Sequence, residues 1–541
     1  MKPTILVVGS GASGVHFTLS MLRKGYRVTM LDVGWAKPPI VNPEDNFDSL
    51  NENLPDPAEY FLGEEFEAVI LPGADDDYIT QYYGFPSSKS YVFKPAKTFD
   101  YKADGMVPLV SFAQGGLAEA WTGGAYPLND AELGEFPFGY EDIRPYYEEV
   151  TRRIGINGAA DDLARFIPVS EALLLPLDLD ENSEDMLARY QSRKTIIQKK
   201  YGCSMGRSRV TTLNQDQDGR EGCTYCGRCL WGCPNGALYT PSITLETCRQ
   251  FADFTYIPGM FVHYFDVDGH KHIKNVIAES LQDGRLHTFS ADTYVLASGT
   301  LSSSKIFLDT LQRATGEIVK LTGLMDNRQV LVPFVNINHI GKAYHSDRYQ
   351  YHQLALGLET ADPVEYIHGQ ITTLKTLQIH PVLQNMPLGL RSATELFKIL
   401  RTGMGVVNLS FYDHRRTENY VSLTPLPDSW RTKLAINYLP EPSQHQMILN
   451  AIKRLRGALR ELGSFVIPGT VMIRPIGASV HYTGTLPMSE NPDTLSTSKY
   501  CQSYDFENLY LVDGSTIPFL PAKNITLTLM ANAVRIAEEA F

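Results

Sequence analysis

A glycine-rich segment near the N-terminus has the residue types and spacing of a dinucleotide-binding site. Gly9, Gly11 and Gly14 form the motif G-x-G-x-x-G between a predicted buried strand and a predicted helix. The free amides at the start of such a helix bind a pyrophosphate. Asp32 follows a second predicted strand, 18 residues after Gly14, where its carboxylate can accept a hydrogen bond from a ribose hydroxyl. The spacing predicts a dinucleotide site but does not choose between FAD and NAD.

A run of four cysteines is the second segment with possible chemistry. Cys223, Cys226, Cys229 and Cys233 follow the spacing C-x2-C-x2-C-x3-C-P. In bacterial ferredoxins three thiolates of such a run hold one iron-sulfur cluster and the fourth ligates another, so a single run lacks a ligand for a four-iron cluster. A three-iron cluster, or a ligand from another cysteine, would complete the site. Zinc fits less well, because four cysteines within eleven residues crowd a tetrahedron. A metal-free structural loop is the alternative.

Two strings near the C-terminus indicate a family. The first begins at His481 and reads His-Tyr-Thr-Gly-Thr-Leu-Pro-Met. The second begins at Asn508, contains Asp513 and Gly514, and is followed by Asn524 just before a predicted helix. Both strings resemble the C-terminal signature of the glucose-methanol-choline (GMC) flavin oxidoreductases. The resemblance implies that the dinucleotide is FAD and that Asp513 and Gly514 contribute to its site.

The resemblance also implies catalytic roles for His481 and Asn524. Hydride transfer from a carbinol carbon to flavin N5 yields a carbonyl only if the hydroxyl proton also leaves, which requires a base within hydrogen-bond reach. His481 is expected to be that base, with a pKa near neutrality. Asn524 is expected to hold the same oxygen through its amide and to stabilise its developing charge. Ile525 follows Asn524 where the family usually has a proline.

Three internal stretches extend the resemblance over most of the chain. The stretch with Gly115, Gly116, Trp121 and Thr122 is similar to the glycine-rich turn that passes under the flavin and pyrophosphate. Its Trp-Thr pair is most similar to the pyranose-oxidase-like branch, where a histidine before the tryptophan bonds covalently to FAD. Ala120 has that position here, so non-covalent FAD is expected. The other two stretches are residues 137–147 and 295–303.

The length and composition are those of a large folded protein. The chain has 541 residues, 43% of them apolar, and a net charge of −13. It can therefore bury the core of two domains, and its charge argues against nucleic acid or an anionic membrane as a target. We recognise no targeting signal and no apolar stretch long enough to span a membrane. Seven cysteines, an odd number, fit a reducing compartment, so we expect a cytoplasmic protein.

The expected fold class is α/β. A Rossmann-type FAD-binding domain should interleave with an α+β substrate domain that contains an antiparallel sheet, as in GMC and p-hydroxybenzoate-hydroxylase-like proteins. Alternating patterns predict strands in residues 417–423 and 433–438, and apolar periodicity predicts a core helix over 442–462. The expected FAD-binding pieces are residues 1–150, 203–310 and 468–541, and the expected substrate-domain pieces are 151–202 and 311–467.

The expected function is FAD-dependent oxidation of a CH-OH group to a carbonyl. The substrate would be a sugar, a polyol or another alcohol, and the electron acceptor would be oxygen, a quinone or a redox protein. The alternative is a flavoprotein that uses FAD structurally or for lyase or isomerase chemistry, as the hydroxynitrile lyases of the family do. The presence of both His481 and Asn524 favours the redox function.

Overall fold

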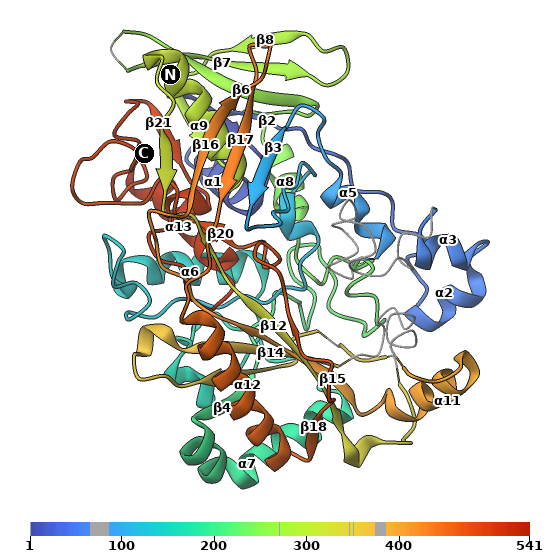
Figure 1. Cartoon of the computed structure of the whole chain (residues 1–541). Helices are drawn as coiled ribbons and strands as arrows, with labels where there is room; N and C mark the ends of the chain where they lie inside the picture. Colours follow the sequence, from blue (N-terminus) through green and yellow to red (C-terminus); the bar gives the residue numbers. More distant parts are fainter. Residues whose placement is uncertain (1, 65–85, 270, 346, 350, 374–385) are drawn as a thin grey trace.

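The protein has two lobes, each built around a different kind of sheet (Figure 1). A parallel sheet lies in the upper lobe of Figure 1, and an antiparallel sheet lies in the lower lobe. Each lobe contains segments from early and late in the sequence, so the lobes are interleaved along the chain. The computed structural model describes residues 2–64, 86–269, 271–345, 347–349, 351–373 and 386–541.

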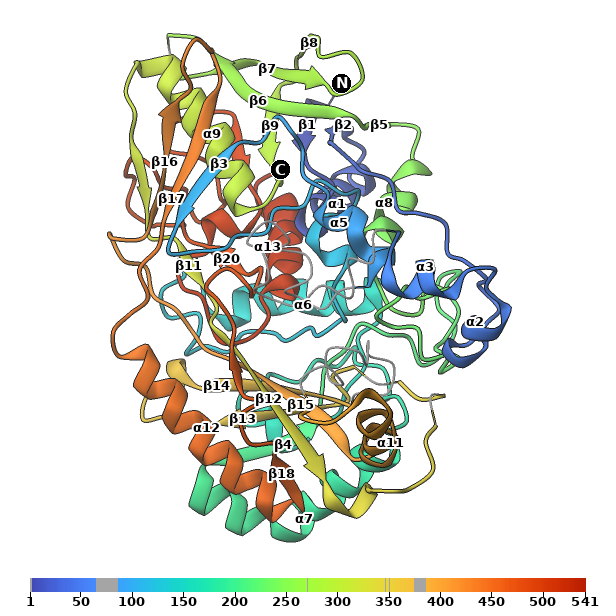
Figure 2. The ribbon, with the colours of Figure 1, turned by 45° about the vertical axis from the view of Figure 1, so that its right-hand side comes forward.

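The parallel sheet has the strand order β21-β9-β1-β2-β5. Alternate residues of β1 face opposite layers: Ile5 and Val7 join the core beneath α1 and α13, whereas Leu6 and Val8 join the core on the other face. Helices α1 and α13 pack against each other (Figure 2). These elements are β1 (Thr4–Val8), α1 (Ala12–Arg23), β2 (Arg27–Leu31), α8 (Pro241–Arg249), β5 (Phe254–Ile257), β9 (Thr293–Leu296), β21 (Leu509–Leu511) and α13 (Thr526–Glu539).

A small antiparallel sheet and helix α9 cover the other face of the parallel sheet. Phe265 and Val276 of the small sheet and Phe307 of α9 share a buried core with Leu6 and Leu296. The parallel sheet is therefore apolar on both faces, as is usual for its class. The covering elements are β6 (Met260–Val267), β7 (Ile273–Ser280), β8 (Leu286–Phe289) and α9 (Thr300–Thr315).

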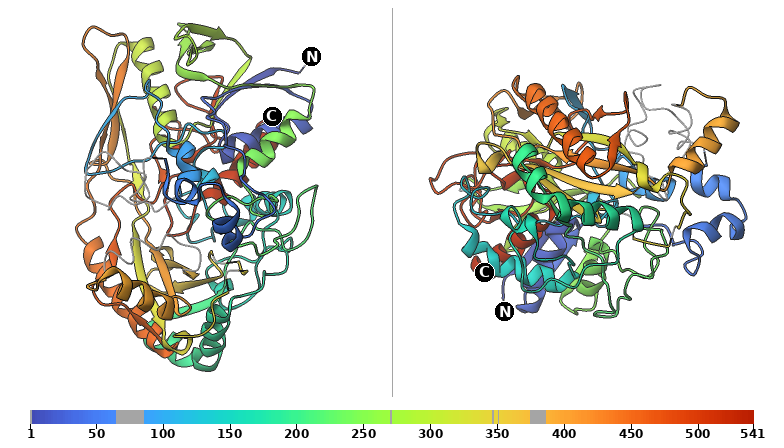
Figure 3. Two further views of the ribbon diagram at one scale, coloured as in Figure 1. Left: turned by 90° about the vertical axis from the view of Figure 1, so that its right-hand side faces the viewer. Right: turned by 90° about the horizontal axis from the view of Figure 1, so that it is seen from below.

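The lower lobe holds an antiparallel sheet with the order β18-β12-β15-β14-β13-β4, and β19 also pairs with β12. Helices α7 and α12 contact each other on one face of this sheet, as the view from below shows (Figure 3). The other face points toward the upper lobe. The elements are α7 (Glu181–Tyr201), β4 (Cys203–Arg207), β12 (Gln329–Asn336), β13 (Leu354–Leu358), β14 (Ile367–Thr373), β15 (Met404–Ser410), α12 (Gln444–Glu461), β18 (Ser464–Val466) and β19 (Met472–Ile473).

Two smaller sheets link segments that are distant in sequence. One has the order β10-β16-β17-β3, and in the other β11 pairs with β20, which directly follows His481. The strands are β3 (Tyr101–Asp104), β10 (Lys320–Thr322), β11 (Met325–Asp326), β16 (Tyr420–Pro425), β17 (Thr432–Asn437) and β20 (Tyr482–Thr483). The remaining α-helices of the described residues are α2 (Phe47–Asn53), α3 (Pro57–Leu62), α5 (Ser90–Phe93), α6 (Tyr140–Ile154) and α11 (Leu390–Leu400).

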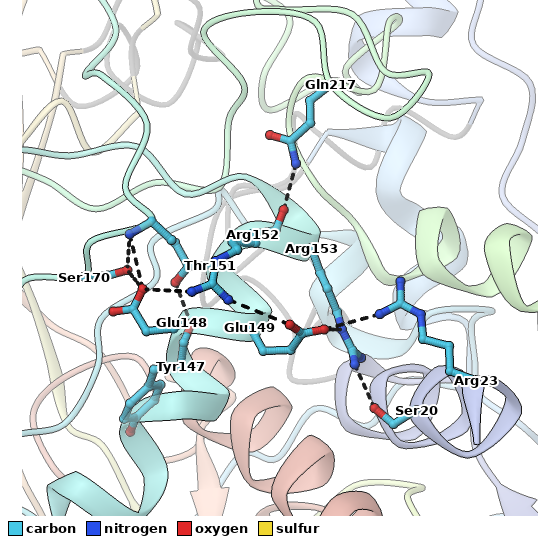
Figure 4. A network of polar contacts seen from close by, with 11 residues as sticks. Ser20, Arg23, Tyr147, Glu148, Glu149, Thr151, Arg152, Arg153, Ser170 and Gln217 are labelled. Atoms are coloured by element: carbon cyan, nitrogen blue, oxygen red, sulfur yellow. Dashed lines mark hydrogen bonds and ion pairs between the residues drawn. The ribbon is translucent and has the colours of Figure 1, made fainter.

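A polar network fixes α6 to the helix that begins at the glycine motif (Figure 4). Arg153 pairs with Glu149 at 2.7 Å and donates to the Ser20 hydroxyl of α1 at 2.9 Å. Arg23 of α1 reaches the same Glu149 carboxylate at 3.3 Å. Arg153 is largely buried and so is held more firmly than a surface ion pair would be. The network thus fixes the direction in which the first turn of α1 points.

The structure confirms the predicted fold class and its local elements. The strand-helix-strand unit around the glycine motif is present, and the two alternating segments pair as β16 and β17. The helix predicted over 442–462 is α12, whose residues Ile448, Leu455 and Leu459 lie in the core. Within the described residues no helix combines the length and apolarity that crossing a membrane requires. The division into domains stays a prediction.

Candidate active site

A large cavity brings the two ends of the sequence together. Its empty volume, which includes open solvent, is about 1350 Å³. Ile525 and Thr526 line it where α13 begins, and Phe261 lines it from β6. The residues predicted from the sequence that line this cavity are Gly9, Gly11, Asp32, Gly116, His481, Asp513 and Gly514.

The start of α1 lies open at one side of this cavity. Gly11 is the N-cap and no side chain caps the helix, so its first amides remain available to an anion. Gly9 has a φ of +101°, and a Cβ atom there would lie 2.7 Å from the Ala297 carbonyl oxygen. Gly14 does not line the cavity; a Cβ atom on it would collide with the Gly9 carbonyl oxygen. The glycines therefore let the chain turn tightly and leave the amides exposed.

Asp32 lies beside the glycine motif at the end of β2. Its Oδ2 accepts hydrogen bonds from the Ser10 hydroxyl and, at 3.0 Å, from the Tyr256 hydroxyl. Burial raises the pKa of Asp32 to about 6, against the effect of these two donors. The carboxylate can accept further hydrogen bonds, as contact with a ribose hydroxyl requires. Asp32 is therefore positioned by Ser10 and Tyr256, which the spacing argument did not identify.

Asp513 orders the C-terminal border of the cavity. Its Oδ2 accepts from the Gly299 amide at 3.0 Å and from the Ser303 hydroxyl at 2.5 Å, and its Oδ1 accepts from the Ser515 amide at 3.0 Å. A Cβ atom on Gly514 would lie 2.6 Å from the Thr300 hydroxyl oxygen. Asp513 thus joins the turn after β21 to the start of α9.

A hydrogen-bonded loop presents His481 to the cavity. The His481 backbone amide donates to the Ser479 hydroxyl oxygen at 2.9 Å, and that hydroxyl donates to Asp326 Oδ1 at 2.5 Å. The Gly477 amide donates to Asp326 Oδ2 at 2.8 Å. Asp326 also pairs with Tyr482 in the ladder between β11 and β20. One buried carboxylate therefore holds both sides of the loop that carries the histidine.

One nitrogen of the His481 ring is left without a hydrogen-bond partner among the described residues. This nitrogen is Nδ1, which is buried. Burial, with a smaller effect of Arg474, lowers the pKa of His481 to about 4, below the near-neutral value expected from the sequence. The imidazole is thus neutral at neutral pH and can accept a proton. A buried polar atom left unpaired costs about 1–3 kcal/mol, which a substrate hydroxyl would offset.

Asn524 lies in the turn before α13 and is fixed from two sides. Gln370 of β14 donates through Nε2 to Asn524 Oδ1 at 3.0 Å. The neighbouring Lys523 is fully buried, pairs with the equally buried Glu132, and donates to the Pro127 carbonyl oxygen at 3.0 Å. Asn524 is not among the residues that line the cavity, although Ile525 is.

Trp121 and Thr122 also lie outside the lining of this cavity. Trp121 donates through Nε1 to the Tyr239 carbonyl oxygen at 2.7 Å. The Thr122 hydroxyl is hydrogen-bonded to His352 Nε2. Gly115 does not line the cavity, but its amide donates to the Ser10 hydroxyl at 2.9 Å, which links the turn to the Asp32 site.

The C-terminal part of the chain matches a known family. Residues 415–533 match the profile described as GMC oxidoreductase. The match contains His481 and Asn524. Residues 415–533 of the chain are thus a GMC oxidoreductase C-terminal segment.

The chain is also similar over its full length to curated relatives and, in its fold, to solved structures. It is 23% identical to the 2-methyl-1,2-propanediol dehydrogenase of Mycolicibacterium austroafricanum, with 99% of this chain and 94% of the relative covered. It is also 23% identical to the fructose dehydrogenase large subunit of Gluconobacter japonicus, with 99% and 97% covered. Its fold is similar to that of formate oxidase from Aspergillus oryzae RIB40, with a TM-score of 0.61, 13% identity, and 99% and 97% covered.

The residues that line this cavity fit FAD. The open amides at the start of α1 suit a pyrophosphate, and Asp32 suits the adenosine ribose. The cavity continues from them to His481, so it spans the distance from a nucleotide end to a reactive end.

The cysteine run of this chain is an anchoring loop in the structure. None of its four thiols forms a disulfide, and the described residues contain no group of three or more His, Cys, Asp or Glu positioned to hold a metal ion. Arg228, within the run, is almost fully buried and donates to the carbonyl oxygens of Val41 and Asn42 at 2.7 and 2.6 Å. The Phe47 amide donates to the Cys226 carbonyl oxygen at 2.8 Å. The run therefore holds the segment around α2, and the iron-sulfur cluster stays a prediction.

Proposed function

We propose that this chain is a GMC oxidoreductase that oxidises the CH-OH group of an alcohol to a carbonyl, with His481 as the general base. The observation that carries the proposal is the neutral, unpaired imidazole nitrogen of His481 in the cavity that also contains the dinucleotide motif. When bound, FAD supplies the acceptor for the hydride.

Residues of the chain would accept the hydroxyl proton and hold the substrate oxygen. His481 accepts the hydroxyl proton as the carbonyl forms, and the low pKa keeps its ring unprotonated before that step. Asn524 holds the substrate oxygen through its amide. Gly9, Gly11 and Asp32 bind the nucleotide half and so fix the position of the reactive half relative to His481.

Sugars, polyols and other alcohols are the proposed substrate class. The relatives named above are dehydrogenases of a diol and of fructose, both of which carry CH-OH groups. Because Ala120 offers no nucleophile where a covalent histidine would stand, FAD is proposed to bind without a covalent bond.

The experiment that tests the function is anaerobic reduction of the purified holoenzyme by a panel of sugars, polyols and simple alcohols. Loss of the visible absorbance of oxidised flavin identifies a substrate, and subsequent mixing with oxygen, a quinone or a redox protein identifies the acceptor. If no member of the panel reduces the flavin while dithionite does, redox oxidation of alcohols is the wrong function and lyase or isomerase chemistry is the next to assay.

A further inference from the structure

Strand β14 presents different chemistry on its two faces. Ile367 and Ile371 point into the core shared with α7 and α12. His368 and Gln370 lie on the opposite face, because side chains alternate along a strand, and both contact Tyr126. The antiparallel sheet thus delivers polar groups to the segment that carries Asn524.

Gln370 uses both hydrogens of its amide nitrogen. Nε2 donates to Asn524 Oδ1 at 3.0 Å and to the Tyr126 hydroxyl oxygen at 3.2 Å. Tyr126 is in turn hydrogen-bonded to Ser208. Gln370 is only 2% exposed, so no solvent competes for these contacts. The side chain is therefore held in one orientation by two partners.

This contact has a consequence for the Asn524 amide. An asparagine amide has an acceptor oxygen and a donor nitrogen at its two ends. Because the hydrogen bond from Gln370 turns Oδ1 toward β14, the Nδ2 end of the amide is the end turned away from Gln370. A substrate hydroxyl has one hydrogen, which His481 is proposed to accept, and its oxygen then requires a donor rather than a second acceptor.

We infer that Gln370 is a positioning residue that fixes the Asn524 amide with its donor end toward the substrate oxygen. The inference rests on the proposed function and adds how the oxygen is recognised: by one acceptor, His481, and one donor, Asn524. It also assigns a catalytic consequence to a residue of the antiparallel sheet, more than 150 positions away from Asn524.

Gln370→Glu reverses the polarity of this contact. An ionised carboxylate only accepts, so Asn524 must turn its Nδ2 toward residue 370 and its oxygen toward the substrate. Losing one donor to a developing alkoxide lowers the rate by about 10² to 10³. A protonated carboxyl donates again, so the flavin-reduction rate should rise as pH falls from about 8 to about 5, because burial raises the pKa of a carboxyl group.

The histidines and the tyrosine beside Gln370 titrate outside this pH range. Burial lowers the pKa of His352 to about 4 and that of His368 to about 3, and it raises the pKa of Tyr126 to about 12. The pKa of His481 is also lowered, to about 4. The nearby Lys523 is paired with Glu132. Asp326, which holds the His481 loop, and Asp32 have pKa values raised to about 7 and about 6, and both titrate in the variant and in the unmodified enzyme alike. The effect of the substitution is therefore the ratio of the variant's rate to the rate of the unmodified enzyme, which should rise as pH falls from about 8 to about 5.

Two further variants control the experiment. Asn408 lies directly opposite Gln370 on β15, so Asn408→Asp places a carboxylate on the neighbouring strand without replacing the donor to Asn524. We expect no rise in its rate as pH falls. Gln370→Leu removes the donor at every pH and should lower the rate by about tenfold or more, without recovery at low pH.

The rates of these variants either support or overturn the inference. All variants are compared as FAD-loaded proteins with the fastest alcohol of the panel, by anaerobic stopped-flow reduction. A parental rate in Gln370→Glu at all pH values, or in Gln370→Leu if the first variant loses FAD, overturns the inference. An equally large rise in the rate of Asn408→Asp as pH falls also overturns the inference. The charge of any nearby carboxylate would then be enough to cause the effect. If the unmodified enzyme reacts with no alcohol, the proposed function itself fails, and this is visible before any variant is made.

Discussion

Replacing His481 tests the proposed chemistry most directly. His481→Ala removes the group that accepts the hydroxyl proton and leaves the Asp326 and Ser479 hydrogen bonds of the loop in place, because those engage its backbone amide. A positioned base contributes about 10² to 10⁴ in rate, which corresponds to about 3–5 kcal/mol of activation free energy. FAD should remain bound, since the nucleotide contacts of Gly11 and Asp32 lie elsewhere in the cavity.

The pKa of His481 sets the pH at which the unmodified enzyme should lose activity. Burial lowers the pKa of His481 from 6.5 to about 4, so the fold disfavours the imidazolium by about 3 kcal/mol. Only the neutral ring accepts a proton, so activity is lost as pH falls through the folded-state pKa. Protonation of His481 should leave the rate of flavin reduction unchanged from about pH 8 to about pH 5 and should lower it as pH approaches 4.

Flavin reduction is measured by anaerobic stopped flow at several pH values and at low substrate concentration. The measurement gives the loss of rate in His481→Ala and the pH dependence of the unmodified enzyme. A reduction rate in His481→Ala within a few-fold of the parent would show that another group takes the proton. A decline centred near the ordinary histidine value, about pH 6.5, would show that His481 is less desolvated in the holoenzyme than the structure indicates. Flavin content and the melting temperature of the variant serve as controls.

Three further outcomes are expected. First, heat or acid precipitation should release FAD into the supernatant because Ala120 cannot bond to it, and flavin retained by the precipitate would reveal another tether. Second, iron and acid-labile sulfide assays on anaerobically purified protein should find less than one iron per chain, whereas three or four irons would establish a cluster at the run that begins with Cys223 and Cys226. Third, burial raises the folded-state pKa of Asp326 from 3.8 to about 7, so the stability it contributes is complete below about pH 4 and is lost as pH rises through about 7. Urea unfolding of Asp326→Asn should show a smaller fall in unfolding free energy between about pH 4 and about pH 7 than the parent does, and parallel curves would contradict the assignment.

The parts of the fold that the sequence predicts are those encoded by neighbours in the chain. The strand-helix-strand unit around Gly9 and the helix α12 follow from hydrophobic periods and glycine positions within about twenty residues. The C-terminal strings located His481 and Asp513, which line the cavity. These residues could be found because their signal is a short, contiguous pattern.

The supporting residues could not be predicted because their contacts are remote in sequence. Gln370 reaches Asn524 across 154 positions, and Ser479 reaches Asp326 across 153. Tyr256 reaches Asp32 across 224. No strand was predicted from the sequence over residues 367–373, so neither β14 nor the partner of Gln370 was foreseen. The lowered pKa of His481 was missed for the same reason, since burial is set by the whole fold.

The interleaving of the lobes has a consequence for biosynthesis. Gly9 and Asp513 line the same cavity although about 500 residues separate them, and β21 must pair with β9 to complete the parallel sheet. Contacts of such long range form late and make folding slow. A nascent chain on the ribosome that has not yet exposed residues 509–541 lacks β21, α13 and the cavity wall that they provide. Cofactor binding should therefore follow translation of residues 509–541, and until then the apolar faces of β1 and α1 that α13 covers stay exposed and prone to aggregation.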